Sequence, residues 1–422
     1  MVYTTTDVFC LQTFRRCRQK DRDHRTQKSH GPVEVSPLVP KESSPLDSVK
    51  PSLLDCPMPP LLVQTRQEEN KVWVKTLCLC LFAPEPDLLV SGIHRSNSNG
   101  TTAPDGVTFF VIQGLASLGD TQMVVFVFLL LGYIIILGGN CLILVVVLTD
   151  PKLSSPMYFF LSHLSFVDMV YTTTTIPKLL CSLLWGVTTI SVPGCFLQMF
   201  FFVQLGATGH SILTVMAYDR YVAICRPLHY GSIMTRPVQL LLVAGAWSFS
   251  ILCTLPAAAI TWQEPYCGPN VVRHGWCDPA SVRRLACADT TVDNLVSLFS
   301  ALVSLLSTGV LILSSYILIG VSISKMAAGE RLKALGTCAA HLSVVTVSYT
   351  SASFVYISYR VGNFPPELMV IAVLYSALTP FLNPLIYSLR NKELQDAIRR
   401  TLSRISCAAA SAAEETDTDK VF

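Results

Sequence analysis

QMVVFVFLLLGYIIILGGNCLILVVVL, residues 122–148, runs for 27 positions without a charged side chain. About 20 apolar residues are enough for an α-helix to cross the hydrocarbon core of a bilayer, whereas a strand of a membrane barrel needs about half that length. Lipid offers the backbone no hydrogen-bonding partner, so a segment of this length must satisfy its own N–H and C=O groups as a helix. The stretch therefore predicts a membrane-spanning helix.

Further apolar stretches of spanning length follow it, separated by short polar segments, at 157–183, 196–225, 239–260, 294–324, 335–358 and 366–389. Together the seven stretches predict an all-α membrane protein built as a seven-transmembrane helix bundle. Directly after them, residues 392–405 place apolar side chains on one side of a helix and basic side chains on the other. That pattern predicts a short amphipathic helix lying on the membrane surface.

The average composition combines two unlike regions. The whole chain carries 14% charged residues, where a soluble protein carries about 25%. Residues 1–98 hold 24 charged side chains, whereas the remaining 324 residues hold 35. We expect a long disordered N-terminal extension over 1–98, a seven-helix domain over 99–405 that includes the amphipathic helix 392–405, and a disordered cytoplasmic tail over 406–422.

The distribution of Lys and Arg in the short loops predicts the orientation, because cytoplasmic loops are enriched in both. One side of the predicted bundle holds Lys152, Arg226, Arg236, Lys325, Arg331, Lys333, Arg390 and Lys392, and fewer basic residues lie on the other. We therefore expect a multi-pass plasma-membrane protein with its N-terminus extracellular and its C-terminus cytoplasmic. The glycosylation sequon at Asn99 and the cysteines of the loop after the fourth stretch fall on the expected outer side.

The sequence contains no recognisable catalytic or metal-binding motif. We find no HExxH, GxSxG or P-loop pattern, and Cys78 and Cys80 lack the spacing of a zinc pair. A net charge of +3 is too small to indicate a nucleic-acid-binding protein. We therefore predict no enzyme activity, no cofactor, no metal and no nucleic-acid partner. A charged side chain inside a membrane-spanning segment costs several kcal/mol and therefore indicates a functional position. Asp168 and Asp219-Arg220 are such positions in this sequence.

Three motifs carry a family resemblance: MAYDRYVAIC at 216–225, PMYFFLS at 156–162 and PFLNPLIYSLRN at 380–391. Over residues 110–402 the chain closely resembles the olfactory receptors of the rhodopsin-like G-protein-coupled receptor family. The tail before Asn97 has no counterpart in the family pattern, and no methionine lies between Met58 and Met123. Our hypothesis for this tail is an aberrant gene model or an unusual upstream exon.

The resemblance implies a polar core at mid-depth, formed by Asn140, Asp168 and Asn383-Pro384. Polar groups from different helices can be arranged in two ways, which suits a conformational switch, although a static network for helix packing is the alternative. Pro384 should interrupt the hydrogen-bond ladder of its helix and free carbonyl groups near Asn383.

The resemblance also implies a G-protein-coupling region at the cytoplasmic edge. Arg220 paired with Asp219 is similar to the family's latch, the ion pair that holds the arginine in the resting state and releases it to contact the G protein. An inert ion pair is the alternative. The other residues assigned to coupling and switching are Tyr221, Tyr316, Lys333 and Tyr387.

On the outer side, Cys195 and Cys277 resemble the pair that joins the third helix to the following outer loop. Cys267 and Cys287 would then close that loop on itself. Four cysteines allow three connectivities, and only the resemblance selects this one.

A binding pocket is expected in the outer half of the bundle. In the third helix, side chains at helical spacing form one stripe: Phe202, Val203, Gly206, Ala207 and His210. The facing wall is predicted from Ser300, Ser304, Ala352, Ser353, Tyr356 and Ser376. The apolar residues could instead serve plain helix packing, and the serine hydroxyls could instead bond carbonyl groups of their own helix. For His210 the alternative is a hydrogen-bonded packing role. Neither wall carries a carboxylate, which favours a small, neutral, mostly apolar ligand.

The chain departs from the family pattern at Gly209, where members often carry an acidic residue, so a family-like sodium site with Asp168 is in doubt. Gly336, Ala340 and Ser348 also differ from the pattern. We predict an odorant receptor that activates a stimulatory heterotrimeric G protein, acts through cAMP and contacts membrane lipid. A rhodopsin-like receptor for a non-odorant metabolite and a transporter or channel are the alternatives; the body shows no repeat or charged path that favours the latter.

Overall fold

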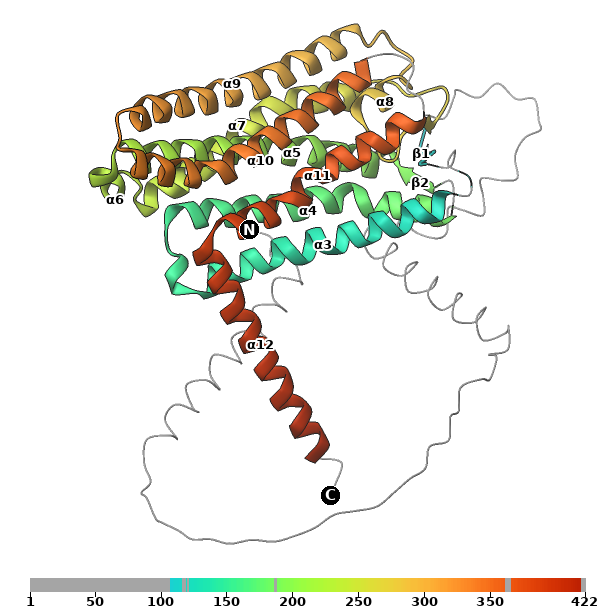
Figure 1. The fold of residues 1–422 in the computed structure, drawn as a ribbon. Helices are drawn as coiled ribbons and strands as arrows, with labels where there is room; N and C mark the ends of the chain where they lie inside the picture. The colour runs from blue at the N-terminus through green and yellow to red at the C-terminus, as the bar shows by residue number, and fades with distance from the viewer. Residues whose placement is uncertain (1–106, 116–118, 120, 186–187, 361–365, 419–422) are drawn as a thin grey trace, which may run out of the picture. The chain divides into compact units, whose positions relative to one another are not determined.

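The computed structural model describes residues 107–115, 119, 121–185, 188–360 and 366–418, drawn in colour in Figure 1. The described residues up to Thr401 belong to one compact unit, Arg66–Thr401. The predicted extension over 1–98 and the sequon at Asn99 lie outside the described residues. So do the side chains of Lys333 and Tyr356, although both residues belong to a described helix.

Seven long helices coincide with the seven predicted stretches and extend them by between one and nine residues. They are α3 (Gln122–Thr149), α4 (Pro156–Trp185), α5 (Val192–Cys225), α7 (Arg236–Gln263), α9 (Thr291–Ser324), α10 (Ala328–Arg360) and α11 (Pro366–Arg390). Short turns connect them: η3 (Pro151–Leu153), η4 (Pro227–His229), α6 (Tyr230–Ile233) and α8 (Pro279–Arg283). Proline at the first turns of α5, α7 and α8 helps to set where these helices begin.

Among the described residues, six of the long helices are apolar enough to cross a membrane by length and composition. The other long helix, α4, has 30 residues but contains many Ser and Thr side chains. These are buried against neighbouring helices rather than turned to lipid, as at Ser165, Thr172 and Thr175. Exposed apolar side chains such as Phe128 and Leu252, each about 70% exposed, mark faces suited to lipid.

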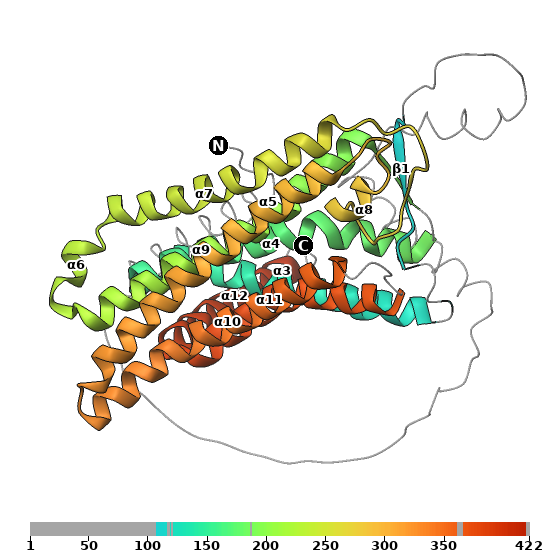
Figure 2. The same ribbon diagram turned by 90° about the horizontal axis from the view of Figure 1, so that it is seen from above.

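The helix α5 lies inside the bundle and packs against α4, α7 and α9 (Figure 2). The helix α11 packs against α10 and α3, so that the first and last spanning helices are neighbours. One large apolar core joins α3, α4, α5 and α11 and includes Phe160, Ile212 and Tyr387. This core holds the polar residues of the helices at fixed positions relative to one another.

A small sheet lies at one end of the bundle, which was not expected from the sequence. The strand β1 (Phe109–Ile112) pairs antiparallel with β2 (Thr188–Ser191) and parallel with β3 (Val271–Val272). Phe110 and Ile112 are fully buried and pack on Cys195 and Phe196. We call this end of the bundle the sheet end, and the opposite end, where α11 finishes, the α12 end.

The last helix, α12 (Lys392–Thr418), begins where the amphipathic helix was expected but runs beyond its expected end at residue 405. The physical reason is an alanine-rich segment at 408–413 followed by two glutamates, all strong helix formers. Its first turns pack on the bundle through Leu394 and Ala397, both fully buried.

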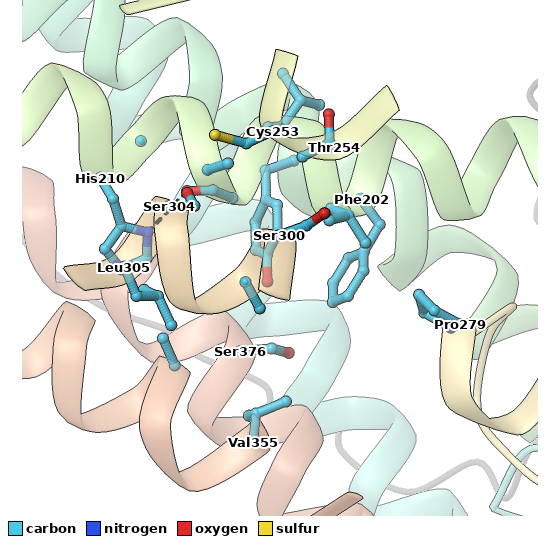
Figure 3. Close-up of a pocket in the computed structure, with 18 of the residues that line it drawn as sticks. Phe202, His210, Cys253, Thr254, Pro279, Ser300, Ser304, Leu305, Val355 and Ser376 are labelled. Atoms are coloured by element: carbon cyan, nitrogen blue, oxygen red, sulfur yellow. Dashed lines mark hydrogen bonds between the residues drawn. The ribbon is translucent and has the colours of Figure 1, made fainter. Parts of the chain in front are cut away.

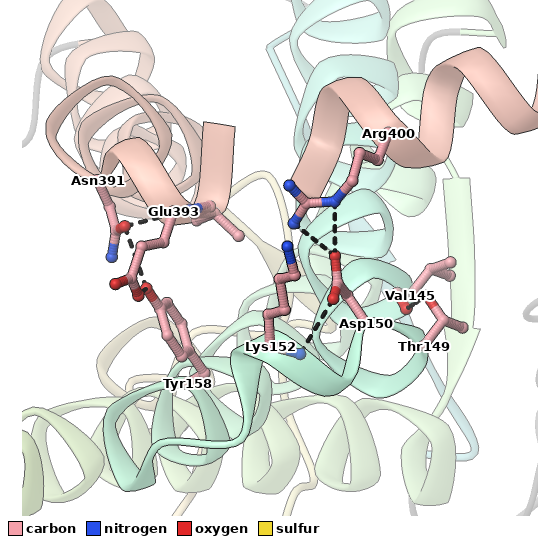
Figure 4. Close-up of polar contacts among 9 residues, drawn as sticks. Val145, Thr149, Asp150, Lys152, Tyr158, Asn391, Glu393 and Arg400 are labelled. Carbon is pink, nitrogen blue, oxygen red and sulfur yellow. Dashed lines mark hydrogen bonds and ion pairs between the residues drawn. The ribbon is translucent and has the colours of Figure 1, made fainter. Parts of the chain in front are cut away.

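Two polar contacts reinforce this attachment, as Figure 4 shows. Arg400 donates to the Asp150 carboxylate at 2.7 and 3.1 Å, and the Tyr158 hydroxyl donates to Glu393 at 2.9 Å. Burial alone would raise the pKa of Asp150, but the hydrogen bond from Arg400 and the nearby positive charges hold it below its ordinary value.

Candidate functional site

A cavity of about 540 Å³ opens among α4, α5, α7, α9, α10 and α11 on the sheet-end side of the bundle (Figure 3). Helix α8 and its flanking residues contribute to its wall from the loop between α7 and α9. The volume lies within the range of about 300–1,000 Å³ that is typical of small-molecule sites. The bundle therefore contains a partly open cavity of the right size for a small ligand.

Nine of the eleven predicted pocket residues line this cavity: Phe202, Val203, Gly206, Ala207, His210, Ser300, Ser304, Ala352 and Ser376. Ser353 does not, because its side chain is exposed on the outer face of α10. It is one residue from Ala352 and is therefore rotated by about 100° around the helix. The side chain of Tyr356 lies outside the described set.

His210 links α5 to α10 at the cavity wall. Its Nδ1 lies 2.9 Å from the Gly206 carbonyl, which can only accept, so Nδ1 carries the proton. In the neutral ring Nε2 then accepts from the Ser348 hydroxyl at 3.1 Å. The Tyr349 ring stands edge-on to the imidazole at 4.9 Å, and its hydroxyl donates to Thr308 on α9 at 2.7 Å. One polar network therefore joins three helices beside the cavity.

The serines of the facing wall come from two helices, as Figure 3 shows for Ser300 and Ser304 on α9 and for Ser376 on α11. The Ser376 hydroxyl donates to the Val373 carbonyl of its own helix at 2.8 Å. Its oxygen lone pairs can still accept a hydrogen bond from a ligand.

Two carboxylates line the cavity from elements outside the two predicted walls, namely Asp168 on α4 and Asp278 just before α8. Arg283 and Arg284 line it near Asp278 at the sheet end. These loop residues were not predicted as pocket residues, because helical periodicity carries no information about how an irregular loop packs on a helix bundle. The Cys277 link to α5 is the one signal that points there.

A lid closes the sheet end of the cavity. Cys195 at the start of α5 is bonded to Cys277 in the loop, and Cys267 is bonded to Cys287 within the loop. Trp276 beside the first bond is 1% exposed and contacts the Phe202 ring of the cavity wall at 5.4 Å. The lid is thus covalently attached to α5 and packed directly on the pocket.

The lid contains a buried histidine. The His274 ring packs edge-on against the Trp276 ring at 4.4 Å. Burial lowers the pKa of His274, because desolvation disfavours its charged form, and the nearby Asp278 opposes this shift. The folded lid therefore prefers the neutral imidazole.

The polar core adjoins the cavity, since Asp168 also lines it. Asn383 donates to Asp168 Oδ2 at 2.7 Å, which joins α11 to α4. Asn140 does not contact this pair directly but donates to the Pro380 carbonyl at 3.1 Å. Pro384 has no N–H to offer that carbonyl four residues earlier, so the α3 side chain takes the place of the missing helix bond.

At the α12 end, Arg220 forms an ion pair with Asp219, with Nε donating to Oδ2 at 3.0 Å. The Asp219 carboxylate is fully buried, and its other oxygen accepts from the Tyr230 hydroxyl of α6 at 2.7 Å. Sequence reasoning missed Tyr230, which lies eleven residues later in a short connecting helix. The arginine is thus held by a carboxylate that a second element also binds.

Tyr316 and Tyr387, which were assigned to coupling and switching, form no described hydrogen bond with Arg220 in this conformation. The Tyr316 hydroxyl bonds the His341 ring at 2.8 Å, and the other ring nitrogen of His341 donates to the Leu213 carbonyl of α5 at 3.0 Å. Tyr387 is 1% exposed, and its hydroxyl has no hydrogen-bond partner among the described residues. Tyr221 packs in an apolar cluster with Ile319 of α9.

Comparison with known proteins decides the family. The olfactory receptor family pattern matches residues 128–405. Human olfactory receptor 6N1 is 44% identical over 305 residues, covering 72% of this chain and 97% of that receptor. Mouse olfactory receptor 4B13 is 43% identical over 295 residues, covering 70% of this chain and 96% of that receptor.

The chain belongs to the olfactory receptor family. Squid rhodopsin shares the fold, with a TM-score of 0.51 and 18% identity over 68% of this chain and 86% of the rhodopsin chain. As a member of this family, the chain is a multi-pass membrane protein of the G-protein-coupled receptor class and not an enzyme. Family membership implies a small-molecule ligand and coupling to a G protein. The cavity and the Asp219–Arg220 pair are the parts of the receptor suited to these two tasks.

Proposed function

We propose that this receptor binds a small, mostly apolar, neutral odorant in the cavity and activates a stimulatory heterotrimeric G protein that raises cAMP. The observation that carries the proposal is the placement of nine predicted side chains around one cavity at the sheet end, with the Asp219–Arg220 pair at the opposite end. The pocket wall is built from the same helices, α5, α9, α10 and α11, that reach the α12 end.

The lining supports this ligand class. Phe202, Val203, Ala207 and Leu305 offer apolar surface, and Ser300 and Ser304 offer hydroxyls for one or two hydrogen bonds. Burying apolar surface contributes roughly 25 cal/mol per Å². A ligand of about ten heavy atoms would then gain most of its affinity from apolar contacts and its orientation from the serines.

For orientation, we propose that the sheet end is extracellular and the α12 end cytoplasmic. The loops at the α12 end carry most of the basic residues of the body, which is the pattern of cytoplasmic loops. The lid cysteines are bonded at the sheet end, which fits an oxidising compartment. The first turns of α12, with Arg399 and Arg400, would then lie near the inner membrane surface and its anionic lipids.

The proposed mechanism is a shift between two arrangements of the bundle. A ligand that contacts α5, α9 and α10 at once favours one packing of these helices. The polar core at Asp168 and Asn383 changes partners as α11 moves, and Arg220 leaves Asp219. The released guanidinium then contacts the G protein, with Tyr316 and Tyr387 free to approach it.

A cAMP reporter assay in cells that express the receptor, with a panel of volatile ligands, tests this function. The expected result is a concentration-dependent rise for at least one ligand, and its loss in Arg220→Ala at equal surface expression. Arg273→Ala, which removes an exposed arginine at the sheet end, is the matched control and should respond normally. Full ligand-driven signalling in Arg220→Ala would contradict the latch assignment.

A further inference from the structure

The cavity is deeper than an outer-half pocket. Its lining follows α5 from Phe202 to Leu213, about 16 Å of helix at 1.5 Å per residue. On α4 it reaches Leu164, one turn beyond Asp168 toward the α12 end, and on α11 it reaches Pro380. The space that receives a ligand is therefore continuous with the surroundings of the polar core.

Two glycines of α5 leave this space open because they lack side chains. Gly206 and Gly209 both line the cavity. A Cβ placed on Gly209 would meet only Val167 Cγ1, at 4.0 Å, so the space beside this glycine is open. A larger side chain at this position would extend into the passage between the outer cavity and Asp168.

Asp168 presents an unused acceptor at the inner end of the cavity. The side chain is 94% buried, as its exposed fraction is 6%, and it lines the cavity. Oδ2 accepts from Asn383, whereas no described residue donates a hydrogen bond to Oδ1. The described cations of the cavity lining are Arg283, the last residue of α8, and Arg284 directly after it, both at the sheet end. A buried carboxylate in this setting gains from any donor that enters.

We propose that Asp168 is a specificity-determining residue of this receptor, which binds the hydrogen-bond-donating end of an elongated ligand through the passage beside Gly209. The donor is a hydroxyl group, which keeps the ligand neutral, and the apolar chain of the ligand lies between α5 and α9. The proposal rests on the proposed ligand-binding function of the cavity. It adds that the polar end of the ligand points inward, toward the polar core, and that the ligand contacts the switch directly.

The test measures ligand-induced thermal stabilisation of purified full-length receptor, without G protein. The probes are straight-chain alcohols, primary amines and methyl ethers of matched chain length. A donor to a buried carboxylate should give alcohols an affinity at least about tenfold above the ethers, which accept but do not donate. A preference for amines over alcohols would contradict both the hydroxyl donor and the neutral ligand of the proposed function.

Gly209→Leu should reduce this donor preference to about threefold or less and shift the best ligands to shorter chains, because leucine fills the passage. The matched control is Gly245→Leu, at an exposed glycine of α7 with nothing within 4 Å of an added Cβ, and it should bind like the parent. Asp168→Asn supplies a second variant of nearly the same shape, and it should also weaken the donor preference.

Equal stabilisation by alcohols, amines and ethers would overturn the proposal, and so would an unchanged preference in both Gly209→Leu and Asp168→Asn. The cAMP assay separates this result from failure of the proposed function. Donor-selective binding without any cAMP response would leave the Asp168 site standing and refute the stimulatory coupling. A cAMP response without donor preference would support the stimulatory coupling and refute the Asp168 site.

Discussion

Replacing Tyr230 by phenylalanine should raise the ligand-free signalling of this receptor. The Tyr230 hydroxyl donates to Asp219 Oδ1 at 2.7 Å, while Asp219 Oδ2 holds Arg220. The substitution keeps the ring and removes this one hydrogen bond. Asp219 then loses a partner in the resting arrangement and binds Arg220 in a less fixed position. We expect Tyr230 to leave Asp219 in the released arrangement, so the substitution should not destabilise that arrangement.

The magnitude follows from the kind of bond. Hydrogen bonds to charged groups contribute about 1.5–3 kcal/mol. We take the lower figure, because the tyrosine is partly exposed and its hydroxyl can bond water after release. A difference of about 1.5 kcal/mol corresponds to a factor of about ten in the equilibrium between the held and released arrangements. If about 1% of resting receptors have released the latch, the variant should reach about 10%.

Basal cAMP production at equal surface expression measures this shift, together with the maximal ligand response. Tyr218→Phe is the matched control, since Tyr218 is an exposed neighbour at the same end of α5 and forms no described hydrogen bond through its hydroxyl. Asp219→Asn should raise the basal signal at least as much. An unchanged basal signal in Tyr230→Phe, with a raised signal in Asp219→Asn, would refute the reasoning that Tyr230 is part of the latch.

Three further predictions concern the lid and the segment between β1 and α3. Cys195→Ser should abolish surface expression more completely than Cys267→Ser in a flow-cytometry assay, because the chain-entropy model assigns about 4.5 kcal/mol to the longer loop and about 3.3 kcal/mol to the shorter one. Gly114→Ala should lower thermal stability more than Gly119→Ala, because both residues have positive φ but only the first would place a Cβ against Ser182. Burial lowers the pKa of His274, so below about pH 6.5 the unfolded lid binds more protons than the folded lid. Thermal stability should therefore fall from pH 7 to pH 5, and it should fall less steeply in His274→Asn.

These three outcomes have clear opposites. Normal trafficking of the Cys195 variant would show that the link to α5 is dispensable. Equal stability of the two glycine variants would show that the contact with Ser182 relaxes without cost. A pH profile identical in the parent and the His274 variant would assign the loss of stability to another group.

The bundle was predictable because the spanning rule depends only on length and apolar content. Even α4, with its run of threonines at 172–175, could be recognised, since it contains few charges and has the length of a span. The sheet was not predictable. The strand β1 has only four residues, and neither of its partners lies within 70 residues of it in the sequence. Such pairing follows from the closed bundle and not from local propensity.

The pocket residues on α5 were predictable because Phe202, Gly206 and His210 recur every four residues on one helix face. The facing wall was harder, because the rotation of α10 about its axis is set by its packing against α11. Ala352 and Ser353 could not be separated without that rotation. Tyr230, His341 and Arg283 are brought to their sites by chain connections or by other helices, so periodicity carries no information about them.

The depth of the cavity depends on an absence of side chains. Gly209 was noted only as a departure from the family pattern that puts a sodium site in doubt. In the folded receptor it leaves open space beside Val167 and lets the cavity reach Asp168. An absent side chain becomes informative only when the surrounding helices are in place.

The most direct test of the central claim is the cAMP response of the receptor to a volatile-ligand panel, compared with that of Arg220→Ala at equal surface expression. The account predicts a ligand-dependent rise that disappears in the variant while ligand-induced thermal stabilisation is retained. A receptor that binds ligand in the cavity and signals equally well without Arg220 would contradict it.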